Sequence, residues 1–371
     1  MSRLFYNHHR SQVLTVLHCL FLIAICGTLL SACDDRHSLL PPSGGKLYEV
    51  LVVGDSDGIV QGVLCQDAPG LPQSEPMFDV STIDRDHFGA GVSATRNIIM
   101  VDVNPGIYSS PKIKYEKNVW AEPQTEVHIH TPSMKMLRDS ISRLSPTLLR
   151  ILSRAELKKN ISLLRNKRNI KMERLVKKMF GFDLWIPMEM TSYKKGKNFL
   201  WMSNSSPTTM KNIVIYKASG EGPSSGRIPD DISQETQRFI ATRDSILGEN
   251  IKGETDAMFM RTVANTVSSD IDFRNSNDRR QWLKDKRNKT LPIMLYRGLW
   301  EMEGDDMGGP FVSRTLAFDA NTPPRFHHSE SIVIEGFVFA PGKKKRNAVK
   351  ELEAVLYTAK KNSKLNKNTT K

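Results

Sequence analysis

Apolar residues in the first part of the chain fall in short runs, and turn-forming residues end each run. The clearest run, YEVLVV at residues 48–53, stops at Gly54 and Asp55. Runs of this length, bounded by Gly, Asp, Asn or Pro, are typical of β-strands. Strands are therefore predicted at residues 48–53, 77–83, 96–103 and 126–130, with a short helix at 57–66.

After Ser133 the spacing of the apolar residues becomes that of a helix. Leu148, Ile151, Leu152 and Ala155 occupy positions i, i+3, i+4 and i+7 and share one helical face. A second helical stretch ends at Gly181, a residue that often terminates helices. Further strands are predicted at residues 183–192, 198–203, 212–217, 293–303, 310–318 and 331–340, and further helices at 233–247 and 344–360.

Strand-rich segments are thus followed by helices twice along the chain. This order favours an α+β fold with two related strand-rich halves, each a mainly antiparallel sheet with helices packed on one face. The expected organisation is a signal peptide at 1–32, a lipidated cysteine and tether at 33–46, a first half at 47–168, a second half at 169–361 and a basic polar tail at 362–371.

The N-terminal segment resembles the signal peptide of a bacterial lipoprotein. Arg3 and Arg10 precede a largely apolar stretch, which ends in the sequence Leu30-Ser31-Ala32-Cys33. This resemblance implies cleavage before Cys33 and attachment of acyl chains to that residue, enough for stable anchoring. The alternative is a single membrane-spanning anchor, because the apolar stretch of about 18 residues is close to the minimum length of a span.

A lipoprotein signal peptide predicts that the protein is located in the Gram-negative cell envelope. Asp34 and Asp35 directly follow the lipidation site and resemble sorting signals of outer-membrane lipoproteins. We therefore expect a lipid anchor in the outer membrane, with the fold facing the periplasm or the cell surface.

Composition narrows the class of protein further. With 39% hydrophobic and 25% charged residues among 371, the chain has the profile of a globular protein rather than a disordered or multi-span membrane protein. Of its four cysteines, Cys65 alone would remain as a free thiol after cleavage and lipidation. The mature fold must then be stabilised by its apolar core and not by an intramolecular disulfide. Cys65 is expected to be a small buried residue.

Positive charge is concentrated in two segments. The chain has 53 Lys and Arg against 40 Asp and Glu, and residues 150–178 and 343–371 hold eleven and ten of the basic residues. An exported address and the absence of interleaved aromatic residues argue against nucleic acid as the partner. Anionic lipid or glycan surfaces and other envelope proteins are the expected partners. The candidate contacts are Lys158, Lys159, Lys167, Arg168, Lys343, Lys344, Lys345 and Arg346.

The segment RGLWEMEGDDMGGPFVS at residues 297–313 allows two interpretations. Its glycines and aspartates suit a β-hairpin with a tight turn. Its acidic residues, close to an arginine and a tryptophan, also suit a ligand-binding or catalytic site. The residues of such a site would be Arg297, Trp300, Glu301, Asp305 and Asp306.

Two histidines are candidates for metal binding. His128 and His130 are two apart on a predicted strand, so their side chains point to the same face. Neutral imidazoles in this arrangement bind zinc or copper, and His327, His328 or Glu126 would supply a third ligand. Solvent-facing histidines are the alternative. No motif of a cofactor is present in the sequence, so no cofactor is expected.

Several of these stretches together resemble a family of bacterial envelope lipoproteins known only as a domain of unknown function. The stretches are residues 48–55, 71–79, 96–103, 120–124, 297–313, 335–341 and 352–358. The resemblance extends over about residues 38–360. It implies the lipoprotein address and an extended α+β fold, and it implies no activity, cofactor or catalytic residue.

The sequence therefore predicts a lipid-anchored envelope protein that acts as a non-catalytic binding or assembly module. The alternative is an envelope hydrolase or glycan-processing enzyme, in which acidic residues of the 301–306 segment provide a proton donor and a nucleophile or stabilising carboxylate.

Overall fold

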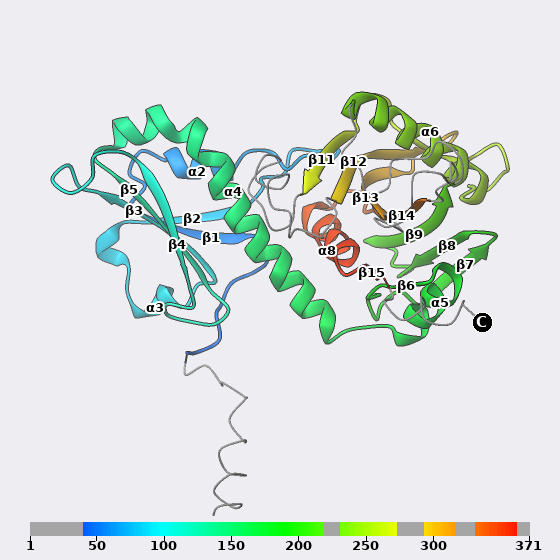
Figure 1. Cartoon of the computed structure of the whole chain (residues 1–371), viewed down its shortest axis with the longest axis horizontal. Helices are drawn as coiled ribbons and strands as arrows, with labels where there is room; N and C mark the ends of the chain where they lie inside the picture. Colours follow the sequence, from blue (N-terminus) through cyan, green and yellow to red (C-terminus); the bar gives the residue numbers. More distant parts are fainter. Residues whose placement is uncertain (1–39, 219–230, 273–292, 317–330, 362–371) are drawn as a thin grey trace, which may run out of the picture.

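The computed structural model describes residues 40–218, 231–272, 293–316 and 331–361. Within these residues the chain forms two units, each with its own sheet, and helix α4 (Met134–Arg165) runs from one unit towards the other (Figure 1). We call the described residues up to 165 the N-terminal unit and those from 166 to 361 the C-terminal unit. Cys33 lies outside the described residues.

The N-terminal unit is built on a mixed sheet. Strands β1 (Glu49–Val53), β2 (Asp79–Ile83), β3 (Asn97–Val103) and β5 (Thr125–Thr131) are parallel, and β4 (Lys112–Lys117) pairs antiparallel with β5, in the order β2-β1-β3-β5-β4. Helices α2 (Ile59–Leu64) and α4 cover one face, where Val52, Ile99, Val127 and Leu148 share a buried core. The short helices η1 (Arg85–His87) and α3 (Ala90–Ser93) follow β2.

The C-terminal unit is built on a larger, antiparallel sheet. Its main path is β10 (Met260–Thr262), β12 (Ile293–Met302), β13 (Gly308–Leu316), β14 (Ser331–Phe339), β9 (Met210–Ala218), β8 (Phe199–Ser203) and β7 (Ser192–Gly196). Strand β11 (Ser268–Asp272) also pairs with β12, and β6 (Phe182–Asp183) pairs with β15 (Lys360–Lys361) in a small separate sheet.

Helices cover both faces of this larger sheet. Helices α5 (Ile170–Phe180) and α8 (Arg346–Tyr357) pack on one face, and α6 (Ile232–Asn250) packs on the other. A strand between two covered faces has no side for solvent, which is why β14 is apolar or buried along almost its whole length. Glu335 of β14 is fully buried and bonds with the fully buried Arg243 of α6, at 2.8 Å. The pairing compensates for taking both charges out of water.

The α+β class, the two strand-rich halves and the mainly antiparallel character of the larger sheet are confirmed. The structure differs from expectation in three details. The smaller sheet is mainly parallel, because its connections cross over instead of forming hairpins, and helices lie on both faces of the larger sheet. Cys65, expected to be buried, is exposed because it follows the last turn of α2 at the surface.

In one buried contact between the units, a residue of the N-terminal unit caps a helix of the C-terminal unit. Helix α8 has no side-chain cap of its own, and Glu75 of the N-terminal unit accepts hydrogen bonds from the backbone N–H groups of Lys345 (2.7 Å) and Arg346 (3.0 Å). A carboxylate at a helix N-terminus both satisfies free N–H groups and interacts well with the helix dipole. The guanidinium of Arg346 also donates to Asp79, at 2.7 Å. The two units are thus joined by specific polar contacts.

Among the described residues, no helix combines the length and the apolar character needed to cross a bilayer.

Candidate functional site

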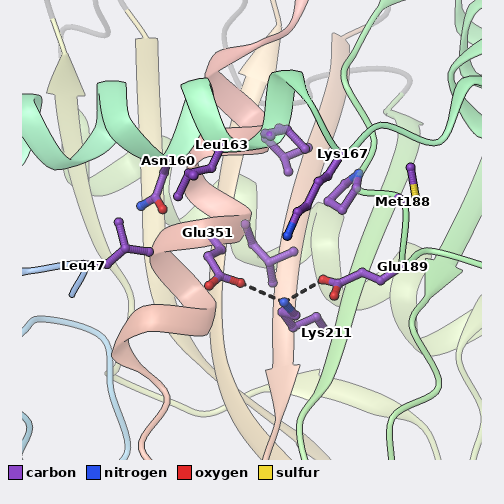
Figure 2. Close-up of a pocket in the computed structure, with 12 residues that line it drawn as sticks. Leu47, Asn160, Leu163, Lys167, Met188, Glu189, Lys211 and Glu351 are labelled. Atoms are coloured by element: carbon purple, nitrogen blue, oxygen red, sulfur yellow. Dashed lines mark hydrogen bonds and ion pairs between the residues drawn. The ribbon is translucent and has the colours of Figure 1, made fainter. Parts of the chain in front are cut away.

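A pocket of about 520 Å³ lies where the two units meet. Figure 2 shows its lining, to which the end of α4, helix α8 and strand β9 contribute. We call it the junction pocket. Its walls are largely apolar, and its size lies within the range of small-molecule sites. The apolar residues are Leu47, Leu163, Leu164, Pro187, Met188, Leu352 and Val355.

The charges in the junction pocket largely neutralise one another. The ammonium of Lys211 lies 2.6 Å from Glu189 and 2.7 Å from Glu351 (Figure 2). Burial lowers the pKa of Lys211, but hydrogen bonds and attraction from the two carboxylates more than offset this effect, so its pKa is raised and it stays charged. Asn160 is buried at the edge of the pocket, and its Nδ2 has no hydrogen-bond partner in the described part of the chain, although Tyr48 lies close to it.

A second recess, of about 560 Å³, has the opposite electrostatic character. It lies between α4, β4 and the segment that enters β5, and we call it the basic cleft. Among its lining residues are six Lys or Arg and no Asp or Glu. The basic residues are Arg96, Lys117, Arg150, Arg154, Lys158 and Lys159.

Helix α4 presents these two recesses on opposite sides. Leu163 and Leu164 lie three and four residues after Asn160, and all three face the junction pocket together with Lys167, which follows the end of the helix. Lys158 lies on the other side of the helix, together with Ile151, Arg154 and Ser162, and faces the basic cleft. Within the long basic stretch predicted from the sequence, the structure thus separates Lys158 and Lys159 from Lys167.

Not all six cations of the basic cleft are equally available. Arg96 is buried and is held by Glu156 at 2.9 Å, and Arg154 lies 3.7 Å from Asp272. Lys117 and Lys158 are exposed, Lys159 is half-buried, and none of the three has an acidic partner among the described residues. A concave surface with several unneutralised cations attracts anions, because their positive potentials add.

The segment predicted as either a hairpin or a site forms a hairpin. Strands β12 and β13 pair across the turn that contains Asp305 and Asp306, both of which are exposed. Trp300 is 2% exposed and packs edge-on against Phe337 in the core. Two other residues of the predicted site form ion pairs. Glu301 pairs with Arg261 at 2.8 Å, and Arg297 pairs with Glu353 at 2.6 Å.

Part of the predicted basic surface is buried instead. Lys345 and Arg346 are 6% and 5% exposed because they lie in the contact between the units, where Glu75 and Asp79 bind them. They therefore do not belong to an exposed basic surface. Arg168 donates to Glu173 and lies 4.9 Å from the ring of Trp185, whereas Lys343 and Lys344 are exposed.

The predicted histidine pair lies on the face of the smaller sheet that α4 does not cover. His128 and His130 have stacked rings, and Asp102 of the neighbouring strand joins them. Burial lowers the pKa of His130, and the attraction of Asp102 opposes the effect only in part. Of the third ligands considered, Glu126 lies beside His128, and His327 and His328 lie outside the described residues.

Together, the two sheets, the shared helix cap and the two recesses along α4 define an α+β protein of two joined units. The model of a domain of unknown function, DUF4837, matches residues 169–358, just over half of the chain. The chain belongs to this family. Residues 43–165 match a second domain of unknown function, DUF8532. Comparison with curated proteins and with solved structures gives no match.

Proposed function

We propose that this protein is a lipid-anchored binding module of the bacterial envelope, which captures a phosphorylated saccharide head group in the basic cleft. The observation that carries the proposal is the convergence of Lys117, Lys158 and Lys159, three lysines without acidic partners among the described residues, on one recess. A recess of about 560 Å³ suits a discrete head group better than a flat membrane surface.

The charge balance favours the basic cleft over the junction pocket as the site for an anion. In the junction pocket two carboxylates already neutralise Lys211, and they would repel a second anion. In the basic cleft the lining contains no carboxylate, and the three lysines have no acidic partner among the described residues. Tyr115, which is 51% exposed, offers an aromatic surface against which a sugar ring can pack.

The course of the chain supports a role close to a membrane. Ser43 donates hydrogen bonds to the carbonyl groups of Glu122 and Pro123, and Pro123 lines the basic cleft. A lipid on Cys33 would be nine residues before Pro42, which forms a bridge to Glu122. Nine extended residues span at most about 30 Å. An anchor at Cys33 therefore keeps this edge of the cleft within reach of head groups in the same membrane.

The direct test is a binding titration of glucose 1,6-bisphosphate, with glucose as the uncharged probe. The mature protein would carry Cys33→Ser, so that no acyl chain interferes. We expect the bisphosphate to bind, glucose not to bind, and the affinity for the bisphosphate to fall as salt is added. Each of Lys117→Gln, Lys158→Gln and Lys159→Gln should weaken binding about fivefold, since a cation close to an anionic group contributes about 1 kcal/mol.

The matched controls are Lys171→Gln and Lys178→Gln, which remove exposed charges of α5 outside the cleft. They have the same effect on net charge and should leave the affinity within about twofold of the parent, because screening weakens distant charges. Equal losses in the cleft variants and the controls would show a general charge effect and would reject the cleft as the site.

A further inference from the structure

Asp102, His128 and His130 place three metal-binding side chains around one point on the smaller sheet. The strand register aligns Asp102 of β3 directly with His130 of β5, and His128 points to the same face two residues earlier. One ligand atom from each residue lies within 4.8 Å of the other two. The cluster is near the carboxyl ends of two parallel strands, where α/β sheets commonly bind ligands.

Two of the three separations between these groups are close to those of ligands around a small metal ion. Asp102 Oδ2 lies 3.7 Å from His128 Nδ1 and 3.6 Å from His130 Nδ1, beyond hydrogen-bond length. Ligands about 2.0–2.2 Å from a tetrahedral zinc ion are about 3.4 Å apart. The carboxylate oxygen is therefore already at a suitable distance from each nitrogen, and the three ligand atoms, all within 4.8 Å of one another, need to draw together to share one ion.

The atoms that do not face the centre are held by neighbouring groups. His128 Nε2 lies 3.2 Å from Glu126 Oε1, and Asp102 Oδ1 pairs with Arg85. A carboxylate that accepts the Nε2–H of a histidine fixes the tautomer in which Nδ1 carries the free electron pair, an arrangement found around many zinc ligands. Glu126 is itself held by Trp120, whose Nε1 donates to Oε2 at 2.9 Å.

We propose that Asp102, His128 and His130 form a binding site for a divalent first-row transition metal ion, with Zn²⁺ as the best match to two imidazoles and one carboxylate. The side chains of the three residues are only partly buried, so an incoming ion can reach them and a fourth position stays open to water. The site is separate from the basic cleft, and its failure would leave the proposed function untouched.

One contact competes with the metal. The hydroxyl of Tyr108 lies 2.7 Å from His130 Nδ1, the same nitrogen that faces Asp102. Binding of an ion to this nitrogen must break that hydrogen bond. Tyr108→Phe should therefore bind Zn²⁺ at least as tightly as the parent, a result that a purely structural hydrogen-bond network would not give.

The test is calorimetric titration of Zn²⁺ into the mature lipidated protein in detergent. The parent carries Cys65→Ser, His327→Gln and His328→Gln, which removes an exposed thiol and a second histidine pair. We expect one ion per chain. His128→Gln and Asp102→Asn should each weaken binding more than tenfold, and Glu126→Gln should weaken it about 10–100-fold through loss of the outer partner.

His87→Gln, which removes an exposed histidine of η1, is the matched control and should bind as the parent does. Thermal unfolding without metal checks that each variant is folded. If a ligand variant unfolds, the Zn²⁺ affinity of Glu126→Gln still tests the site. Absence of Zn²⁺ binding by the parent, or equal binding by the parent and a folded His128→Gln/His130→Gln variant, would overturn the proposal.

Discussion

Arg297 of β12 and Glu353 of α8 lie 2.6 Å apart, and this ion pair attaches the helix to the sheet beneath it. Both side chains are largely buried, and Lys350 donates to the other oxygen of Glu353 at 2.9 Å. The segment that contains Arg297 predicts either a hairpin or a ligand site, and the structure pairs Arg297 with Glu353, which is 56 residues later in the chain.

The first prediction concerns the pH dependence of stability. Burial raises the pKa of Glu353, but the charges of Arg297 and Lys350 outweigh burial and lower it from 4.5 to about 2. In the unfolded chain the carboxyl titrates near its ordinary value, so the folded state binds fewer protons between these two values. The contribution of Glu353 is complete above about pH 4.5 and is lost as the pH falls towards about 2. Urea unfolding at pH 7, 4.5 and 3 measures this loss.

Glu353→Gln should remove much of that pH dependence and lower the free energy of unfolding at pH 7 by about 3–5 kcal/mol, because it leaves Arg297 buried without its carboxylate. Glu116→Gln, an exposed substitution on β4, is the control and should be close to neutral. A Glu353→Gln protein that keeps the full acid sensitivity of the parent would contradict the assignment.

The second prediction concerns the contact between the units. Glu75→Ala removes the carboxylate that accepts the N–H groups of Lys345 and Arg346, and the loss of a helix cap costs about 1 kcal/mol. We expect faster hydrogen exchange at these two amides and easier proteolysis between the units. Gln66→Ala, an exposed change in the same loop, is the control. Unchanged exchange at both amides would show that the cap does not protect them.

The third prediction concerns the close approach of β13 to β14. A Cβ atom on Gly309 would lie 2.0 Å from the carbonyl oxygen of Val338, which also accepts the indole N–H of Trp300. Gly309→Ala should therefore destabilise the C-terminal unit by about 1–3 kcal/mol or more. Gly62→Ala in α2 meets nothing within 4 Å and should stabilise the protein by about 0.5–1 kcal/mol. Thermal unfolding distinguishes the two, and a neutral Gly309→Ala would show that the strands can separate.

Local pattern was sufficient to predict many elements of the fold. The runs that begin at Tyr48 and Arg96 are strands, and the three- and four-residue spacing after Ser133 is a helix. The direction of pairing was harder to infer, because it depends on how the chain crosses between strands. The runs in β1 and β3 are apolar without alternation, which is the signal of a strand buried on both faces and could have indicated a parallel sheet.

The parts of the sites that the sequence does not predict are formed by residues from distant segments of the chain. The local charge of the sequence predicts Lys158 and Lys159, but Lys117, which shares their cleft, is about 40 residues earlier and has no distinctive local pattern. Asp102 joins the histidine pair only through the register of β3 and β5. The burial of Arg346 has no local signal in the sequence, because its partner Asp79 is 267 residues away in the chain.

The fourth prediction concerns the lipid anchor, on which the membrane position of the basic cleft depends. The sequence Leu30-Ser31-Ala32-Cys33 provides one thiol for acylation, so Cys33→Ser should abolish incorporation of labelled palmitate and release the protein from the membrane fraction. Cys65→Ser, which removes the exposed thiol of the N-terminal unit, is the matched control and should leave both properties unchanged. If the Cys33→Ser protein stayed in the membrane after a high-salt wash, the apolar stretch before it would itself be the anchor. Palmitate labelling of the parent that persisted in Cys33→Ser would place the lipid elsewhere.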